Sequence, residues 1–167
     1  MEILFENSYV RNKELAKELY RYFYFQRKWL VVCYVLIFLS FFVNILISIF
    51  DKTYNWSILI FTPLFFLFQL YCYFHQVSRM IKRDYEVHHK EISVDTIVTN
   101  DYIQSVSSAG GVIKLEYNNI KYVVQTKNLI LLRTKANLLS IFRKDTFKKG
   151  TKEDFISFII SKGIKVK

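Results

Sequence analysis

Residues 29–50 read WLVVCYVLIFLSFFVNILISIF, an apolar run without a single charged side chain. Residues 55–74 read NWSILIFTPLFFLFQLYCYF, and this second run is also free of charge. A helix needs about 20 apolar residues to cross a hydrocarbon core roughly 30 Å thick. The link between the runs, residues 51–54, is so short that the two helices can only be antiparallel neighbours. We therefore predict a two-helix transmembrane hairpin over residues 29–75.

A cleaved signal peptide and a pair of buried core helices are the two alternative interpretations of these runs. A signal peptide has an apolar stretch of about 7–15 residues that ends in small residues. The first run is longer than that and follows 28 residues of mixed charge. Two helices buried in a soluble protein would need a larger surrounding body than 167 residues provide. Both alternatives are therefore less well supported than the hairpin.

Basic residues flank the hairpin at its two outer ends, whereas the link holds one lysine that Asp51 offsets. Lysine and arginine collect on the cytoplasmic side of membrane spans. We therefore expect a multi-pass protein of the cell membrane with both termini in the cytoplasm. The flanking residues are Arg21, Arg27, Lys28, Arg79, Lys82 and Arg83.

A few polar side chains interrupt the two apolar runs. Ser40, Asn44 and Ser48 recur every four residues and so share one helix face, while Thr62 and Gln69 lie in the second run. Ion and proton pathways in membranes usually use ionisable groups, and neither run has one. Hydrogen bonding and close packing between helices are therefore the favoured role. The alternative is a small transport or envelope-stress component that acts as a homo-oligomer through these helices.

Residues 1–28 are predicted to form a short strand at residues 2–5 and an amphipathic helix from about Lys13. Asn12 can cap the first turn of this helix, and Leu15 and Leu19 begin its apolar stripe. Such a helix could lie in the membrane surface or pack on the C-terminal domain, and the sequence leaves both interpretations open.

Residues 84–167 are predicted to form a cytoplasmic antiparallel β domain. Ile113, Leu115 and Tyr117 alternate with polar residues, as on a half-buried strand. Turn residues separate about six such segments, and no helix comes between them, which favours a meander over an α/β fold. Thr151 and Asp154 have the spacing of a capping box ahead of one apolar helix. The predicted fold is an α+β membrane protein whose hairpin carries a small β barrel capped by the C-terminal helix.

This arrangement resembles the YcxB-like family of small bacterial membrane proteins. The residues that carry the resemblance are the segment YNNI at 117–120, the pair Leu131–Leu132, the segment IFRKDTF at 141–147 and the helix entry Gly150–Thr151. Phe142 stands where the family pattern usually has proline. The resemblance implies a short N-terminal segment, a transmembrane hairpin and a cytoplasmic domain like the pleckstrin-homology domain, and it implies no established activity.

We find no catalytic or metal-binding constellation in the sequence. A glycine-rich phosphate loop, a His-Glu-x-x-His motif, a nucleophile elbow and paired metal-type cysteines are all absent. His88 and His89 are adjacent, so on a strand they would point to opposite faces. We therefore expect a non-enzymatic protein with no metal and no cofactor.

The formal charge of +10 concentrates after the hairpin, since residues 76–167 hold 17 basic and 9 acidic side chains. Each basic residue near an anionic leaflet contributes about 1 kcal/mol of attraction. No nucleic-acid-binding motif accompanies the charge, so we do not expect a nucleic-acid partner. We predict a membrane-anchored binding or regulatory module that contacts the lipid bilayer and either anionic lipid headgroups or a cytoplasmic protein segment. The candidate contacts are Arg79, Lys82, Arg83, Arg143, Lys144, Lys148, Lys149 and Lys152.

Overall fold

The computed structural model describes residues 2–26, 28–51, 56–89 and 91–167, with the side chains of residues 24–26, 28–30, 51, 56–59, 80, 84 and 88 left out. Residues 52–54 of the predicted link and the side chains of Arg27, Lys28 and Asp51 therefore lie outside the described part. The chain divides into two compact units. The sheet unit combines Met1–Asn12 with Asp84–Lys167, and the helical unit is Lys13–Arg83.

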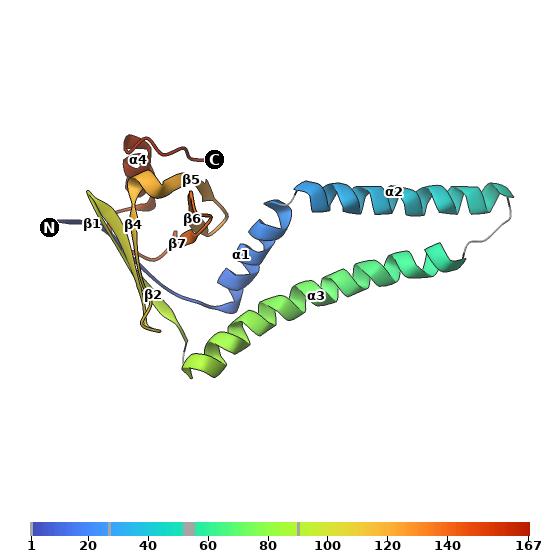
Figure 1. Ribbon diagram of the computed structural model, residues 1–167, viewed down its shortest axis with the longest axis horizontal. Coiled ribbons are helices and arrows are strands. Elements are labelled where there is room, and N and C mark those ends of the chain that lie inside the picture. Colours follow the sequence, from blue (N-terminus) through green and yellow to red (C-terminus); the bar gives the residue numbers. More distant parts are fainter. Residues whose placement is uncertain (1, 27, 52–55, 90) are drawn as a thin grey trace. The chain divides into compact units, whose positions relative to one another are not determined.

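The helical unit contains α1 (Lys13–Gln26), α2 (Lys28–Asp51) and most of α3 (Trp56–His88). The predicted helix from Lys13 is confirmed. Within this unit α2 and α3 run side by side in opposite directions (Figure 1). The Tyr34 ring of α2 lies 6.4 Å from that of Phe65 and 6.1 Å from that of Phe66, both on α3.

The predicted pair of transmembrane helices is wrong. Among the described residues, α2 is the one helix that is long and apolar enough to cross a membrane, over Val31–Phe50. The second predicted span, residues 55–74, is not a separate apolar helix. From Trp56 onward it is the first part of α3, which continues without a break to His88 and carries Arg79, Lys82 and Arg83 in its later turns.

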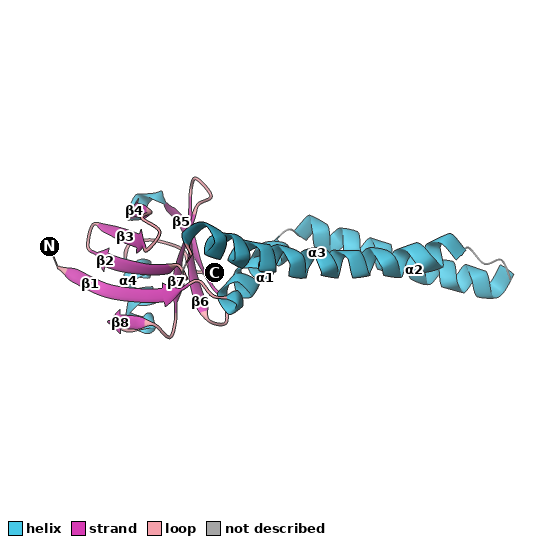
Figure 2. Cartoon of the chain, turned by 90° about the horizontal axis from the view of Figure 1, so that it is seen from below, coloured by secondary structure: helices cyan, strands magenta, loops and turns pink. Residues whose placement is uncertain are grey.

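The larger sheet of the sheet unit has five antiparallel strands in the order β4-β3-β2-β1-β8 (Figure 2). The N-terminal strand extends well beyond the predicted residues 2–5 and lies inside the sheet, between β2 and β8. Its pairing with β2 runs from Ile3 opposite Thr99 to Val10 opposite Ser93. The Arg11 amide then donates to the Ile92 carbonyl at 2.9 Å. The strands are β1 (Ile3–Val10), β2 (Ser93–Thr99), β3 (Tyr102–Ser107), β4 (Val112–Glu116) and β8 (Phe147–Lys149).

The smaller sheet has three antiparallel strands, β5 (Ile120–Gln125), β6 (Leu129–Thr134) and β7 (Leu139–Arg143). The predicted barrel is wrong, because the eight strands form two sheets that do not close on each other. A 3₁₀ turn, η1 (Tyr117–Asn119), carries the chain from the edge strand β4 into β5 instead of letting these two strands pair.

The last helix, α4 (Lys152–Ser161), covers the main core of the sheet unit. Its predicted cap is confirmed, since the Asp154 amide donates to the Thr151 hydroxyl at 3.1 Å. The Phe155 ring is completely buried and lies 5.5 Å from the Phe5 ring of β1 and 4.6 Å from the Phe142 ring of β7. Burying one such side chain stabilises a fold by about 1.5–3 kcal/mol. This helix therefore joins the two sheets through aromatic packing.

A buried amide makes a second connection between the sheets. Asn7 of β1 is 1% exposed. Its Nδ2 donates to the carbonyl of Arg143 at 2.7 Å, and its Oδ1 accepts from the Arg143 amide at 3.1 Å. One side chain thus satisfies both backbone groups at the end of β7, as a neighbouring strand would.

Replacing Asn7 with alanine is expected to lower the free energy of unfolding by about 2 kcal/mol, because a buried backbone group left without a partner costs about 1–3 kcal/mol. Urea unfolding of the full chain, followed by the far-ultraviolet circular dichroism of its strands, measures the change. Asn118→Ala is the matched control, since Asn118 is an exposed residue of η1. Equal stability of the two variants would show that the Asn7 bridge contributes nothing.

Tyr117 holds the 3₁₀ turn against the larger sheet. Its hydroxyl donates to the carbonyl of Thr99, and its ring lies 5.7 Å from that of Phe158. Burial raises the pKa of the Tyr117 phenol well above its usual value, and the negative charge of Asp101 raises it further. The folded protein therefore stabilises the neutral phenol.

Because the folded pKa is raised, this stabilisation is complete below the unfolded pKa of about 10 and is lost as the pH rises above it. Tyr117→Phe is expected to cost about 1 kcal/mol at pH 8 through the lost hydrogen bond. The difference between wild type and variant is expected to shrink as the pH rises from 9 to about 11. Urea titrations at each pH measure it, and a constant difference would refute the assignment.

Candidate functional site

The basic cluster predicted between residues 143 and 152 is gathered around β7 and β8, and its side chains are engaged with the protein itself. The Arg143 guanidinium holds the Asp145 carboxylate at two points, Nε to Oδ1 at 2.8 Å and Nη2 to Oδ2 at 3.0 Å. The Lys144 ammonium donates to the carbonyl of Thr126 at 2.6 Å, which ties the end of β7 to the turn between β5 and β6. These two cations therefore stabilise the smaller sheet.

The three lysines of the same cluster also have partners. Lys148 pairs with Asp95 and Lys152 with Glu153, each at 3.4 Å, and Lys149 donates to the carbonyl of Ile3. A hydrogen bond from Ser8 and the nearby Lys148 ammonium lower the pKa of the Asp95 carboxyl. Exposed ion pairs such as these contribute about 0–1 kcal/mol each, so a stronger anion could displace the carboxylates.

The other predicted contacts, Arg79, Lys82 and Arg83, belong to the helical unit. They lie on α3 with exposed side chains, and their spacing places all three on one side of the helix. The predicted candidate residues are therefore divided between the two units, five in the sheet unit and three in the helical unit.

A second basic surface in the sheet unit was missed by the sequence interpretation. The C-terminal segment runs parallel to β5, with Val166 opposite Val123. The Val123 amide donates to the Lys165 carbonyl at 2.8 Å, and the Lys167 amide donates to the Val123 carbonyl at 2.9 Å. Lys165, Lys167 and Lys121 of β5 are all exposed, and we call these three residues the tail surface.

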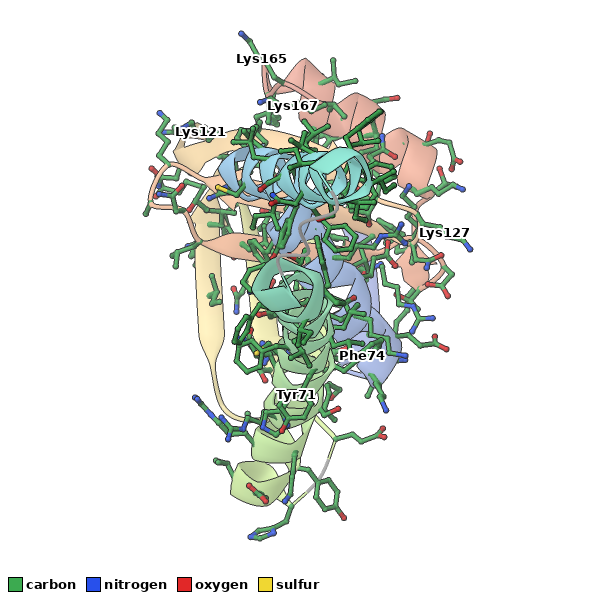
Figure 3. All side chains as sticks on the ribbon, turned by 90° about the vertical axis from the view of Figure 1, so that its right-hand side faces the viewer. Tyr71, Phe74, Lys121, Lys127, Lys165 and Lys167 are labelled. Atoms are coloured by element: carbon green, nitrogen blue, oxygen red, sulfur yellow. The ribbon has the colours of Figure 1, made fainter. Side chains whose placement is uncertain are left out.

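The tail surface carries positive charge without neighbouring carboxylates in its own strands. Lys165 and Lys167 project from the border of the sheet unit, with Lys121 near them and Lys127 on a different side (Figure 3). The Lys167 ammonium lies 4.3 Å from the centre of the Tyr122 ring, a cation–π contact. Residues 120–125 and 164–167 contain no aspartate or glutamate. The signal in the sequence is the alternation Ile164, Lys165, Val166, Lys167, which predicts a strand with one basic face.

Two of the polar residues predicted to pack in the membrane, Asn44 and Ser48, bond within their own helix. Asn44 Nδ2 donates to the Ser40 carbonyl at 2.8 Å, and the Ser48 hydroxyl donates to the Asn44 carbonyl at 2.8 Å. Ser48 is buried, while Thr62 and Gln69 are half-buried on α3. The three residues of α2 thus share one face, as their spacing predicts, and the side chains of Asn44 and Ser48 bond one turn back along α2.

Neither histidines nor cysteines form a reactive cluster in the described part of the chain. Within it, no group of three His, Cys, Asp or Glu side chains could hold a metal ion. Cys33 and Cys72 are free and half-buried. The features of the described part that could support a function are therefore its exposed basic side chains and the apolar helix α2.

The comparisons with known proteins bear on the sheet unit. No curated protein and no solved structure matches the chain. The model of one family, described as YcxB-like protein, matches residues 98–159. That segment begins near the end of β2 and reaches α4, and it contains the YNNI and IFRKDTF segments on which the resemblance was based. The family that matches residues 98–159 is therefore the one that the resemblance named.

Proposed function

We propose that this protein is a non-catalytic binding module anchored to a membrane by α2, with anionic lipid headgroups as the partner of its exposed cations. The observation that carries the proposal is the surface of α2. Its stretch Val31–Phe50 has no charged side chain, and only 6% of it is buried within the protein. In a soluble protein this contiguous apolar surface would be exposed to water, and exposed apolar patches of this size are rare in soluble proteins. A hydrocarbon environment removes that cost.

The position of β1 argues against a cleaved signal sequence. α2 lies near the N-terminus, as a signal sequence does. Cleavage after α2 would remove β1, which lies between β2 and β8 inside the sheet, together with the Asn7 bridge. The apolar helix therefore belongs to the folded protein.

The same pairing supports a placement of the two strands on one side of the membrane. β1 precedes the helices and β2 follows them, and the two strands are paired along their whole length. The sheet unit, to which both strands belong, therefore lies on one side of any membrane that α2 enters. We place the sheet unit in the cytoplasm, because basic residues favour that side.

The charges support an anionic partner. The helical unit has nine basic and three acidic residues, and the sheet unit has fifteen basic and eleven acidic residues. Eight of the nine basic residues of the helical unit lie in residues 13–28 and 79–83, on either side of the apolar part. Tyr71 and Phe74 of α3 are exposed just before this second group (Figure 3). Aromatic rings followed by cations are typical of a membrane interface.

Two arginines in the middle of α2 are expected to release the protein from membranes. In Leu39→Arg/Val43→Arg each change costs about 2.5–3.5 kcal/mol of insertion free energy. Cell fractionation followed by carbonate extraction measures the membrane-bound share. Val112→Arg is the control, since Val112 is also an exposed apolar residue, on β4 of the sheet unit. Wild-type protein in the soluble fraction, or an unchanged double variant, would contradict the anchor.

The lipid partner is tested with the full chain in nanodiscs made with or without an anionic phospholipid. Hydrogen exchange of residues 120–125 and 163–167 is expected to slow in the anionic discs. In Lys121→Gln/Lys165→Gln/Lys167→Gln this protection should fall by most of its size, since each lysine contributes about 1 kcal/mol near an anionic surface.

The matched control is Lys148→Gln/Lys149→Gln/Lys152→Gln, which removes the same charge from lysines that already have partners. It is expected to keep most of the protection at the tail surface. If hydrogen exchange at the tail surface is equally fast in both kinds of disc, this surface does not bind anionic lipid. That result would not affect the α2 anchor, which the arginine variant of α2 tests separately.

A further inference from the structure

The sheet unit contains a cavity of about 350 Å³ that lies apart from the tail surface. It opens on the inner face of the larger sheet, where that face meets β7. The buried residues Tyr9, Ile92 and Val94 form its floor, and the exposed residues Ala109, Gly111 and Ile113 lie at its mouth.

The cavity exists because α4 is too short to cover the whole sheet. A ten-residue helix is about 15 Å long, whereas the eight residues of β1 extend about 27 Å. α4 packs on the end of the sheet that contains Phe5, Val98 and Ile103. The opposite end, which begins at Tyr9 and its partner Val94, has no helix of the sheet unit above it.

The Tyr9 hydroxyl is a buried donor at this end of the sheet. Tyr9 is 6% exposed, and its hydroxyl makes no hydrogen bond to any residue that the structure describes. Burial raises the pKa of this phenol to about 12, although the Arg11 charge opposes the shift. The hydroxyl is therefore protonated at neutral pH and can donate a hydrogen bond into the cavity. Buried polar groups in folded proteins are rarely left unpaired.

The other lining groups define the chemistry of an occupant. Arg11 supplies the only formal charge among the residues that line the cavity. The Ser107 hydroxyl accepts from the Ala109 amide at 3.2 Å, which leaves its own proton to donate, and Ser140 adds another hydroxyl. The remaining wall is mostly aliphatic, with Ile92, Ile113, Leu139 and Ile141. Hydroxyl donors and a cation among the lining residues, together with an aliphatic wall, suit an anion that carries an apolar chain.

We propose that this cavity binds a monoanionic amphiphile, with its carboxylate or phosphate on Arg11 and the Tyr9 hydroxyl and its short apolar chain against the aliphatic wall. The volume is at the small end of ligand pockets, which span about 300–1,000 Å³, so it accommodates a short chain. The ligand could reach the site free in solution or as part of a membrane lipid. This site is independent of α2 and of the tail surface.

The probe is octanoate, added to the full chain in nanodiscs of zwitterionic lipid, with 1-octanol as the neutral counterpart. Carbon-13 labelling of tyrosine Cζ gives a signal for Tyr9, assigned by its loss in Tyr9→Phe. We expect octanoate to shift this signal saturably and octanol to leave it unmoved. Arg11→Gln should weaken octanoate binding about tenfold, since hydrogen bonds to charged groups are the stronger ones. Lys121→Gln, on the tail surface, should bind like wild type.

A blocking variant keeps the test decisive if Arg11→Gln does not fold. A Cβ at Gly111 meets only Ser107 Cβ, at 3.9 Å, so Gly111→Phe can fill the mouth without disturbing the sheet. It should abolish the octanoate shift. No saturable shift in wild type, an equal effect of octanol, or unchanged binding in Gly111→Phe would overturn the proposal.

A second set of discs distinguishes the two sources. If a membrane lipid is the occupant, discs with an anionic phospholipid should shift the Tyr9 signal before octanoate is added and make it insensitive to octanoate. If the ligand comes from solution, the signal in those discs should still respond to octanoate as it does in zwitterionic discs. Either result supports an anion site at Arg11, whereas no response in both discs overturns it.

Discussion

The antiparallel pairing of β1 with β2 is the contact on which the rest of the structure depends. These strands are neighbours in the sheet, yet residues 11–92, with the entire helical unit, lie between them. Closing a loop becomes only slightly more costly as it lengthens, by about 0.6 kcal/mol for each doubling. Folding the loop into long helices reduces the disorder that closure must overcome. The hydrogen bond from the Arg11 amide to the Ile92 carbonyl joins the two ends of this inserted segment.

This pairing also sets an order of assembly. β1 leads the chain, but both strands beside it, β2 and β8, follow the helices, and the Arg143 backbone that Asn7 satisfies lies later still than β2. The sheet therefore cannot be completed until the helical unit has been made. A helix as apolar as α2 aggregates if it waits in water. If α2 enters a membrane as it emerges, the sheet closes afterwards at the membrane surface with the apolar helix already removed from water.

Local structure could be predicted from the sequence, and non-local pairing could not. The strand through Ile113 and Leu115 and the Thr151 cap are confirmed because alternation and capping depend on neighbouring residues. The length of β1 was missed, because Glu6 and Asn7 break its apolar pattern and its buried Asn7 is explained only by Arg143. The prediction of a closed barrel was wrong for a similar reason, because nothing in the local sequence at Tyr117 distinguishes a 3₁₀ turn from a tight hairpin. The basic residues between 143 and 152 were predicted as a cluster because they are close in sequence, but each of them has a partner in the protein. Lys121 and Lys165 are far apart in sequence, and only folding brings them to one border, so the tail surface was missed.

The inner face of the larger sheet is divided by a row of polar residues. Asn7, Thr96 and Ser105 stand side by side across β1, β2 and β3, between the core under α4 and the cavity beyond it. Burying them costs little because they are bonded: Asn7 to Arg143, and Thr96 to Ser105 at 2.9 Å. An aliphatic row here would let α4 and the core slide along the sheet, because apolar packing has no direction. Hydrogen bonds have a direction, so the bonds of Asn7 to the Arg143 backbone fix the end of β7 against the larger sheet, and the Thr96–Ser105 bond fixes β2 against β3.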